Sequence, residues 1–405
     1  MKKIAIIGCG QRAYASYAQV FCKSFRDRIQ LVGVCDPNLT RANYFRDTLD
    51  KDIQVYQDFG RMLAETKPDY VLVTTVDQFH HEYIIRALES GCDVIVEKPM
   101  TNTVEKVRLI RDAEKRTGRK IIVTFNCRFM PTMVKLKELI LSGAVGNPLA
   151  VNYEYYLNKV HGGDYFKRWH RKLENCGGMM VHKSTHHFDI ANWLIGDDPE
   201  SVSAFGNRVY YGNDDRPHGE RCTTCKTPCE SYENIAANDL YKCLYLDAEH
   251  EDGYVRDHCV FKPDTDIYDN MSVSVKYKGG AILTYSLNMF STYEGYRIAV
   301  TGDRGRLELK EDYTAKAARE YGYQVRLIKP GAEIYDIEFP RAEGLHSGAD
   351  EKLLAMLLSE NREDPLGQCS DSLDGMKSAL IGICANESIA SGHAVDIGSI
   401  LKKLK

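Results

Sequence analysis

The sequence predicts an α/β protein with two sheets: a doubly wound parallel sheet in the N-terminal part and an open, mostly antiparallel sheet in the C-terminal part. Three observations predict this class: a glycine-rich turn after the first apolar segment, strands that alternate with helices up to about residue 126, and a series of strands beyond residue 202. Because 405 residues exceed one typical hydrophobic core, we expect two domains, 1–126 and 127–405.

A glycine-rich turn connects the first two predicted elements. Residues 3–7 are a short apolar run, predicted as a buried strand, and residues 14–26 are predicted as a helix. Gly8 allows a tight turn, Gly10 leaves room for a pyrophosphate, and the small Ala13 lets the helix pack closely on the strand. Free N–H groups at the helix N-terminus can then bind phosphate oxygens. This arrangement is typical of a Rossmann dinucleotide-binding domain.

An acidic residue ends the second predicted strand, 30–35. The carboxylate of Asp36 can accept hydrogen bonds from ribose hydroxyls and would repel a 2′-phosphate, which favours NAD over NADP. The alternative is a glycine turn in an α/β protein that binds no dinucleotide. The cofactor-binding residues expected in this unit are Gly8, Gly10, Gln11, Arg12, Ala13 and Asp36.

Polar residues follow the later strands of the first domain. The further strands expected here are 54–56, 69–75, 93–97 and 120–126, and the helices are 59–65, 80–90 and 103–116. Ligands bind outside the carboxyl ends of such strands, so we expect cofactor contacts from Thr74, Thr75, Asp77, His80, Glu97, Lys98, Asn126 and Arg128. Pro99 favours an extended Lys98, which would direct its ammonium toward the nicotinamide; the alternative is an exposed lysine before a turn.

The second domain begins with a linking helix, 131–142, and a strand, 150–157. Residues 161–171 then form a polar and aromatic stretch that is too irregular for a core element. Aromatic faces beside hydrogen-bonding groups suit a sugar pocket, so Tyr165, Trp169 and His170 are candidate substrate contacts. The alternative is a loop packed by its own aromatic side chains.

Residues 179–195 are predicted as one helix that ends at Gly196. His182, His186 and Asp189 are spaced so that they share one face of that helix. This face suits acid–base catalysis or, through the histidine pair, a metal ion; structural histidines are the alternative. His187 and Asp189 join the candidate substrate contacts.

The remaining chain is rich in strands and ends in helices. The predicted strands are 202–211, 271–277, 281–289, 296–301, 306–309, 324–328 and 333–339, and the final helices are about 350–359 and 370–391.

A cysteine-rich insertion of about 212–268 interrupts these strands. Its ligand candidates are Cys222, Cys225, Cys229 and Cys243, with Cys259 following later, and the C-x2-C spacing is typical of a tetrahedral thiolate site. A metal would cross-link a segment that has little apolar content. We expect structural zinc; an iron–sulfur cluster and free thiols are the alternatives.

Composition excludes several classes of partner. The net charge of −4 gives no electrostatic case for nucleic acid or an anionic membrane, and no apolar run approaches a membrane span. The first apolar run stops after five residues, so we expect no signal peptide and a cytoplasmic protein.

Taken together, these motifs resemble the Gfo/Idh/MocA family of oxidoreductases. The resemblance rests on the glycine turn, Asp36, residues 74–80, Glu97-Lys98-Pro99, Asn126-x-Arg128 and the helix with His186-x-x-Asp189. It implies a Rossmann domain followed by an α/β domain whose open sheet often forms the oligomer interface, and hence a dimer or tetramer. It also implies that Lys98 and His186 are catalytic. The family's usual aspartate four residues before the catalytic histidine is His182 here.

The resemblance implies an NAD-dependent dehydrogenase that acts on a secondary alcohol of a sugar or glycoside. We expect His186 to accept the hydroxyl proton, Lys98 to donate to the same oxygen, and His182 and Asp189 to orient His186 or a substrate hydroxyl. One alternative is an NAD-dependent glycosidase or lyase that oxidises its substrate transiently and eliminates the aglycone. Another is an NAD-bound sugar sensor without enzymatic activity.

Overall fold

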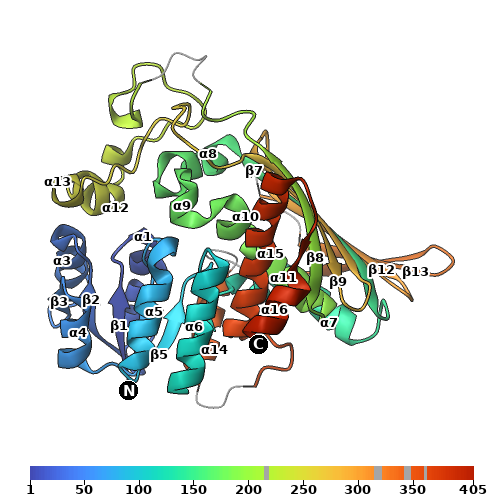
Figure 1. Ribbon diagram of the computed structural model, residues 1–405, viewed down its shortest axis with the longest axis horizontal. Coiled ribbons are helices and arrows are strands. Elements are labelled where there is room, and N and C mark those ends of the chain that lie inside the picture. Colours follow the sequence, from blue (N-terminus) through green and yellow to red (C-terminus); the bar gives the residue numbers. More distant parts are fainter. Residues whose placement is uncertain (214–218, 314–321, 342–347, 360–362) are drawn as a thin grey trace.

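The computed structural model describes residues 1–213, 219–313, 322–341, 348–359 and 363–405. Five residues of the predicted insertion, 214–218, therefore lie outside the described part. Within it, the strands form two sheets, one of six strands and one of nine, with helices around the first and along one face of the second (Figure 1).

The six-stranded sheet is entirely parallel and has the order β3-β2-β1-β4-β5-β6. Its strands are β1 (Lys2–Ile7), β2 (Ile29–Cys35), β3 (Gln54–Tyr56), β4 (Tyr70–Val73), β5 (Asp93–Val96) and β6 (Ile121–Val123). Helices cover both of its faces, so the central strands are apolar runs and Ile4, Ala5 and Ile6 of β1 are fully buried. This order confirms the predicted doubly wound Rossmann sheet.

Three helices of this half begin at polar caps. The helices of this half are α1 (Gln11–Ala13), α2 (Gln19–Lys23), α3 (Leu39–Thr48), α4 (Phe59–Thr66), α5 (His80–Glu89) and α6 (Val104–Thr117), and a π-helical turn, Tyr14–Ala18, joins α1 to α2. The side chains of Asn38, Asp58 and Thr103 accept hydrogen bonds from the first-turn amides of α3, α4 and α6.

The nine-stranded sheet confirms the predicted open, mostly antiparallel sheet. Its order is β14-β13-β12-β11-β7-β10-β9-β8-β15, and only β7 and β10 run parallel among its pairs of described strands. The strands are β7 (Pro148–Asn158), β8 (Pro199–Asn207), β9 (Asn270–Tyr277), β10 (Ile282–Ser291), β11 (Gly295–Gly302), β12 (Arg306–Asp312), β13 (Tyr323–Lys329), β14 (Glu333–Phe339) and β15 (Val395–Asp396). Alternate residues of β9 are buried and exposed, as expected for a sheet with one covered face.

The second half contributes the remaining described helices. They are α7 (Pro131–Leu141), α8 (Lys159–Lys167), α9 (Leu173–Cys176), α10 (Gly178–His182), α11 (Thr185–Ile195), α12 (Asp239–Tyr241), α13 (Glu249–Asp252), α14 (Ala349–Leu357), α15 (Ser372–Ser391) and α16 (Ile397–Leu404). The C-terminal segment returns to the first sheet, where Asp371 pairs with Ile122 of β6. The division at 126/127 therefore remains a prediction.

The structure corrects three predicted elements. The stretch 161–171 is helical, because Asn158 caps α8 and a 3₁₀ turn, Trp169–Arg171, follows. The predicted strand 202–211 ends at Asn207, since the carboxylate of Asp269 binds the amides of residues 209–211. The predicted helix 179–195 is two helices, α10 and α11, interrupted at residues 183–184.

No helix in the described ranges combines the length and apolar character that crossing a membrane requires.

Candidate functional site

The glycine turn after β1 forms a cradle that a side chain would fill. Gly8 has a φ of +94°, and a Cβ there would lie 2.7 Å from the carbonyl oxygen of Thr74. The Thr74 hydroxyl donates to the Gly8 carbonyl at 2.8 Å, which fixes the turn against β4. Gly10 precedes the N-terminus of α1 and has an extended conformation. These features fit the pyrophosphate of a dinucleotide.

Asp36 lies at the tip of β2, beside this turn. Its carboxylate accepts hydrogen bonds from the amides of Cys9 (2.7 Å) and Asn38 (2.9 Å). Burial raises its pKa despite these bonds. The two amides hold the carboxylate at the strand end, which is the position expected for a ribose-binding acid.

The second part of the site is built around Lys98, at the end of β5. Its Nζ donates to the carbonyl oxygen of His182 at 3.2 Å and lies 3.5 Å from the Nε2 atom of the same residue. The other ring nitrogen, Nδ1, lies 2.6 Å from a carboxylate oxygen of Asp77. Strand ends of the first sheet therefore supply an ammonium and a carboxylate on either side of one imidazole.

The interruption between α10 and α11 explains the position of His182. The amides of Lys183 and Ser184 both donate to the Met179 carbonyl, and α11 begins with bonds to the Ser184 carbonyl. The His182 carbonyl is thereby available to the Lys98 ammonium. His182 and His186 belong to different helices, so the continuous face predicted for His182, His186 and Asp189 does not exist.

Burial sets the protonation states of this group. It lowers the pKa of Lys98 to about 8, although Glu97 and Asp77 act in the opposite direction. Burial, together with the Lys98 charge, lowers the pKa of His182 well below its usual value. Burial raises the pKa of Asp77. With one proton in the Asp77–His182 bond, the lone pair of His182 Nε2 faces the Lys98 ammonium at 3.5 Å and can accept a proton; this tautomer is assigned from the hydrogen-bond partners.

Three predicted substrate residues surround His182. The ring centroid of His170 lies 4.2 Å from that of His182, and those of Trp169 and Tyr165 lie at 5.5 and 5.7 Å. Trp169 stacks on His170 with centroids 3.6 Å apart. The Nδ1 atom of His170 is buried and has no hydrogen-bond partner among the described residues. The structure therefore brings Tyr165, Trp169 and His170 together with the lysine and His182.

Two predicted site residues bind each other instead. The guanidinium of Arg128 donates to both carboxylate oxygens of Asp189, at 2.6 and 2.8 Å, and their side chains are only 3% and 1% exposed. Arg128 also donates to the Gly367 carbonyl. The structure therefore places Arg128 and Asp189 in a buried ion pair with each other, and their predicted contacts with the cofactor and the substrate remain predictions.

A similar network occupies other predicted cofactor residues. Arg12 binds Glu97 (2.6 Å) and both oxygens of Asp350 (3.0 and 3.1 Å), and Asn126 donates to Asp350. Arg12 and Glu97 therefore link the glycine turn to β5 and α14. The side-chain oxygen of Asn126 is buried without a hydrogen-bond partner in the described ranges, so it can accept from a ligand N–H.

Another predicted cofactor residue, His80, holds two strand-end loops together. His80 is buried, and its two ring nitrogens contact the Thr75 carbonyl at 3.1 Å and the Pro99 carbonyl at 2.9 Å. It thus joins the loop after β4 to the loop after β5, and its predicted contact with the cofactor remains a prediction.

The remaining histidines of α11 lie within packed rings. His186 packs edge-on against Phe125, with centroids 6.1 Å apart. His187 stacks on Tyr155 at 4.2 Å and hydrogen-bonds the Tyr285 hydroxyl at 2.7 Å. The structure therefore places His187 in the core, and the catalytic role of His186 remains a prediction.

Sequence reasoning missed two residues at the site. The Nζ of Lys183 lies 4.9 Å from the ring centroid of Tyr155. Its positive charge contributes to lowering the pKa values of Lys98, His182 and His187. Its place beside His182 in the sequence was the available signal. Tyr245 of the insertion accepts a hydrogen bond from the Gln11 amide at 2.9 Å, and nothing in the local sequence indicated this contact.

The cysteines are grouped differently from the prediction. Cys222, Cys225, Cys229 and Cys259 line one cavity of about 20 Å³, and Cys243 does not. Cys243 belongs to a π-helical turn, Lys242–Leu246, and it lies close enough to Tyr44 to contribute to the raised pKa of that phenol. In the described part of the chain, no three histidine, cysteine, aspartate or glutamate side chains are arranged to hold a metal ion. The predicted zinc or iron–sulfur site with Cys243 is therefore not supported.

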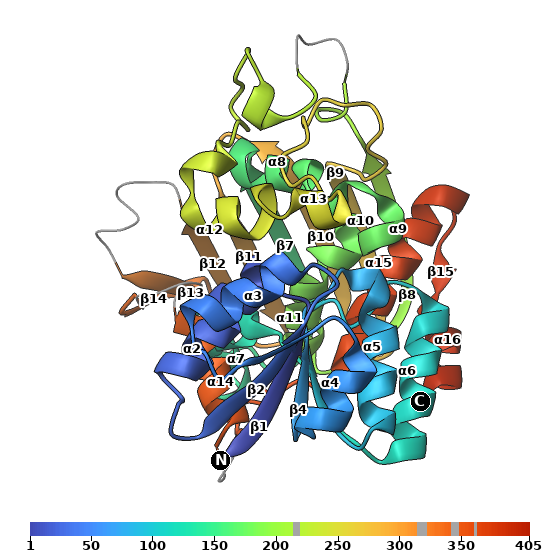
Figure 2. The same ribbon diagram turned by 90° about the vertical axis from the view of Figure 1, so that its left-hand side faces the viewer.

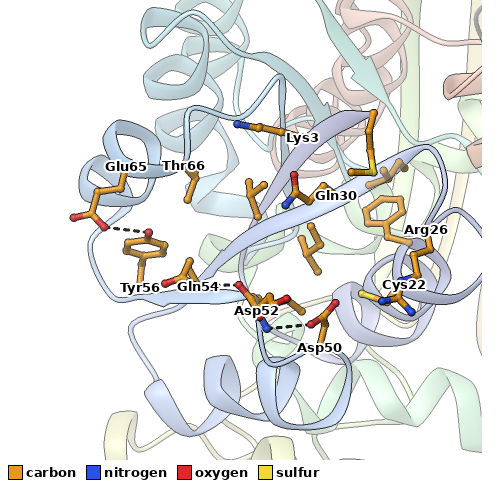
Figure 3. A pocket seen from close by; sticks show the side chains of 16 residues that line it. Lys3, Cys22, Arg26, Gln30, Asp50, Asp52, Gln54, Tyr56, Glu65 and Thr66 are labelled. Atoms are coloured by element: carbon orange, nitrogen blue, oxygen red, sulfur yellow. Dashed lines mark hydrogen bonds between the residues drawn. The ribbon is translucent and has the colours of Figure 1, made fainter.

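A separate cavity of about 420 Å³ lies at the amino ends of β1 and β2 (Figure 3). Asp50, Asp52, Tyr56 and Glu65 are among its lining residues, and the Tyr56 hydroxyl donates to Glu65 at 3.1 Å. Ligands of open parallel sheets bind at the opposite, carboxyl ends of the strands. We therefore assign the functional site to the strand ends around Gly8 and Lys98.

Comparison with known proteins agrees with this geometry. A model described as "Oxidoreductase family, NAD-binding Rossmann fold" matches residues 2–125, and one described as "Oxidoreductase family, C-terminal alpha/beta domain" matches residues 137–397. The chain belongs to the Gfo/Idh/MocA family. It is 33% identical to YteT of Bacillus subtilis (strain 168), across 96% of this chain and 95% of that protein. The predicted family is confirmed, and the chain is an NAD-binding oxidoreductase.

Other relatives of this Gfo/Idh/MocA protein match over part of their length. It is 32% identical to D-glucoside 3-dehydrogenase of Escherichia coli (strain K12), over 48% of this chain and 54% of that enzyme. The fold is similar to a crystal structure of an oxidoreductase from Agrobacterium radiobacter in complex with NAD+, L-tartaric acid and magnesium, with a TM-score of 0.69, 18% identity and coverage of 98% of this chain and 99% of that one. At this identity the structural likeness supports the fold alone.

Proposed function

We propose that the protein oxidises a secondary alcohol of a sugar or glycoside with NAD, or reduces the corresponding ketone. The observation that carries this proposal is the pairing of Lys98 Nζ and His182 Nε2, 3.5 Å apart at the carboxyl ends of the parallel strands. Groups this close can both reach one hydroxyl oxygen. The partial match to D-glucoside 3-dehydrogenase and to inositol dehydrogenases supports the substrate class.

The glycine turn, the Gln11 amide and Asp36 would hold the dinucleotide, which supplies the hydride acceptor when bound. His182 Nε2 accepts the hydroxyl proton, and Asp77 stabilises the imidazolium that forms. The Lys98 ammonium donates to the same oxygen and stabilises its developing negative charge. Tyr165 and Trp169 would cover the sugar ring, while His170 would bind a hydroxyl.

This assignment differs from the expected roles of the two helical histidines. His182 becomes the proton acceptor because Asp77 and Lys98 orient it. Both oxygens of Asp189 accept hydrogen bonds from Arg128, whereas a carboxylate oxygen of Asp77 lies 2.6 Å from His182.

The test is the formation of NADH, followed by absorbance, with a panel of sugars and glycosides. We expect at least one member of the panel to reduce NAD in the wild-type protein, and the Lys98→Met variant to lose this activity while it still binds NADH. Substantial turnover in Lys98→Met would contradict the mechanism. The absence of NADH formation with every sugar, despite tight NADH binding, would instead favour the sensor.

A second candidate is the glycosidase or lyase that oxidises its substrate transiently. The neighbouring imidazole of His170 favours it, because burial lowers its pKa well below the usual value and leaves a second neutral base beside His182. Removal of a proton next to a new ketone needs such a base. Release of the aglycone without accumulation of NADH would identify this reaction.

The predicted homo-oligomer and cytoplasmic location remain predictions. The outward face of the nine-stranded sheet, where alternate residues of β9 are exposed, is the surface that a second copy would cover.

A further inference from the structure

One segment of the insertion covers the nucleotide end of the first sheet. Residues 241–254, here called the flap, contain the π-helical turn Lys242–Leu246 and α13, and they lie against α3 and the glycine turn (Figure 2). The side chain of Asn38, two residues after Asp36 in the chain, donates to the Ala248 carbonyl at 2.9 Å. The flap therefore forms a wall beside the place where the adenosine ribose binds.

A carboxylate of the flap fills the N-terminus of α3. Glu251 accepts hydrogen bonds from the amides of Leu39 (2.6 Å) and Thr40 (2.8 Å), and also from the Thr40 hydroxyl. The N-terminus of this ten-residue helix favours an anion through its free N–H groups and its dipole. A 2′-phosphate on the ribose near Asp36 would need such donors, and Glu251 already holds them.

A second carboxylate of the flap neutralises the nearest guanidinium. Asp252 accepts from Arg41 at 2.6 and 3.2 Å, and Arg41 also donates to the Leu244 carbonyl at 2.9 Å. An arginine at this position could otherwise bind a 2′-phosphate. Because Arg41 is 9% exposed and all three of its side-chain nitrogens already donate to the flap, its charge is neutralised there and a 2′-phosphate would have to displace Asp252.

A tyrosine of the flap reaches the pyrophosphate cradle. The Tyr245 hydroxyl accepts from the Gln11 amide at 2.9 Å and lies 3.5 Å from the position of a Cβ on Gly10. A pyrophosphate oxygen at that amide would meet the hydroxyl, which can turn to donate to it. The flap thus contacts two parts of the expected cofactor, its pyrophosphate and its adenosine ribose.

We infer that the flap is the specificity wall of the nucleotide site: Glu251 and Asp252 exclude a 2′-phosphate, and Tyr245 binds the pyrophosphate. This inference rests on the proposed NAD-dependent function and extends it. Asp36 favours NAD by its own charge, whereas the flap removes the donors that NADP would require. Two carboxylates near a phosphate each add repulsion, worth about a tenfold change in affinity.

The test compares the affinities of NADH and NADPH, measured by titrating the nucleotide fluorescence, in purified wild-type and variant proteins. We expect the ratio of the NADPH Kd to the NADH Kd to fall about tenfold in Glu251→Ala or Asp252→Ala and further in the double variant. Glu251→Gln, which removes the charge and keeps the volume, should show part of this fall. Asp247→Ala is the matched control, because it removes an exposed carboxylate of the same flap that pairs with Lys242.

Tyr245→Phe tests the pyrophosphate contact separately. We expect it to speed the release of NADH severalfold, measured by displacement with excess NAD in a stopped-flow experiment, without altering the NADPH to NADH ratio. An unchanged ratio in the double variant, with NADH still bound, would overturn the specificity role. Unchanged NADH release in Tyr245→Phe would overturn the pyrophosphate contact. Failure of the wild-type protein to bind NADH would contradict the proposed function itself.

Discussion

Two polar groups at the strand ends differ in the hydrogen-bonding capacity that they leave for a ligand. The Arg128–Asp189 pair satisfies itself, since the guanidinium donates to both carboxylate oxygens and both side chains are almost fully buried. In the Lys98–His182 group, the ammonium has three donors and two acceptors on His182, the carbonyl at 3.2 Å and the Nε2 atom at the longer distance of 3.5 Å, so it retains a donor for a further hydrogen bond.

This difference separates a structural pair from a candidate catalytic group. Both contain a cation at the end of a strand and a partner from residues 182–189, so residue type alone does not distinguish them. The hydrogen-bond partners of each group distinguish the two. A charged group whose hydrogen bonds are made within the protein stabilises the fold, whereas a group with a donor left over can bind substrate.

The largest expected effect is on kcat/KM, and it distinguishes the roles of the two helical histidines. We expect His182→Ala to lower kcat/KM by about 10²–10⁴-fold, because His182 Nε2 is the proton acceptor held by Asp77. His186→Ala should lower it less than about tenfold, although both variants remove one imidazole. Steady-state rates of NADH formation measure both. The reverse order would restore His186 as the base and contradict the comparison.

Breaking the self-satisfied pair should affect stability more than chemistry. Asp189→Asn leaves the Arg128 guanidinium buried with a weaker set of partners, and we expect it to lower the free energy of unfolding by about 3 kcal/mol. Urea unfolding followed by fluorescence measures this. Arg326→Ala, which removes an exposed pair with Asp336, is the control and should cost at most about 1 kcal/mol. A normally stable Asp189→Asn protein without activity would show that Asp189 belongs to the active site.

The smallest effect is a pH dependence of the catalytic group. The pKa of Lys98 is lowered to about 8 by burial, so its ammonium form is lost as the pH rises above that value. We expect kcat/KM to fall about tenfold per pH unit well above pH 8, because the charged form stabilises the substrate oxygen. His182 stays neutral through the same range, since its pKa is lowered well below the usual value. A wild-type kcat/KM that stays constant well above pH 8 would contradict this role of the Lys98 ammonium.

Local sequence patterns predict the elements that depend on interactions between residues close together in the chain. The glycine turn, Asp36 and Glu97-Lys98-Pro99 follow apolar strands, and the carboxyl ends of parallel strands necessarily meet at one edge. The sequence also predicts Tyr165, Trp169 and His170 as sugar contacts in an irregular stretch; the stretch is helical and brings these three side chains together around His182.

The rest depended on contacts between distant segments. The interruption of the helix at residues 183–184 follows from tertiary contacts such as that between Ser184 and Tyr285, which no periodicity reveals. The grouping of Cys259 with the three earlier cysteines depends on the pairing of Arg221 with His258. The flap contacts join residues more than 200 positions apart, such as Gln11 and Tyr245. Spacing along the chain carries no information on such pairs.

The interruption between α10 and α11 has a consequence for mutagenesis. Of the two acceptors that His182 presents to the Lys98 ammonium, one is a ring nitrogen and the other is a peptide oxygen. Replacing side chains one at a time can delete the first but leaves the second in place. A saturation scan of residue 182 would therefore underestimate how strongly this position fixes the lysine, and atom-level backbone substitution, such as an ester in place of the following amide, would be needed to expose the remainder.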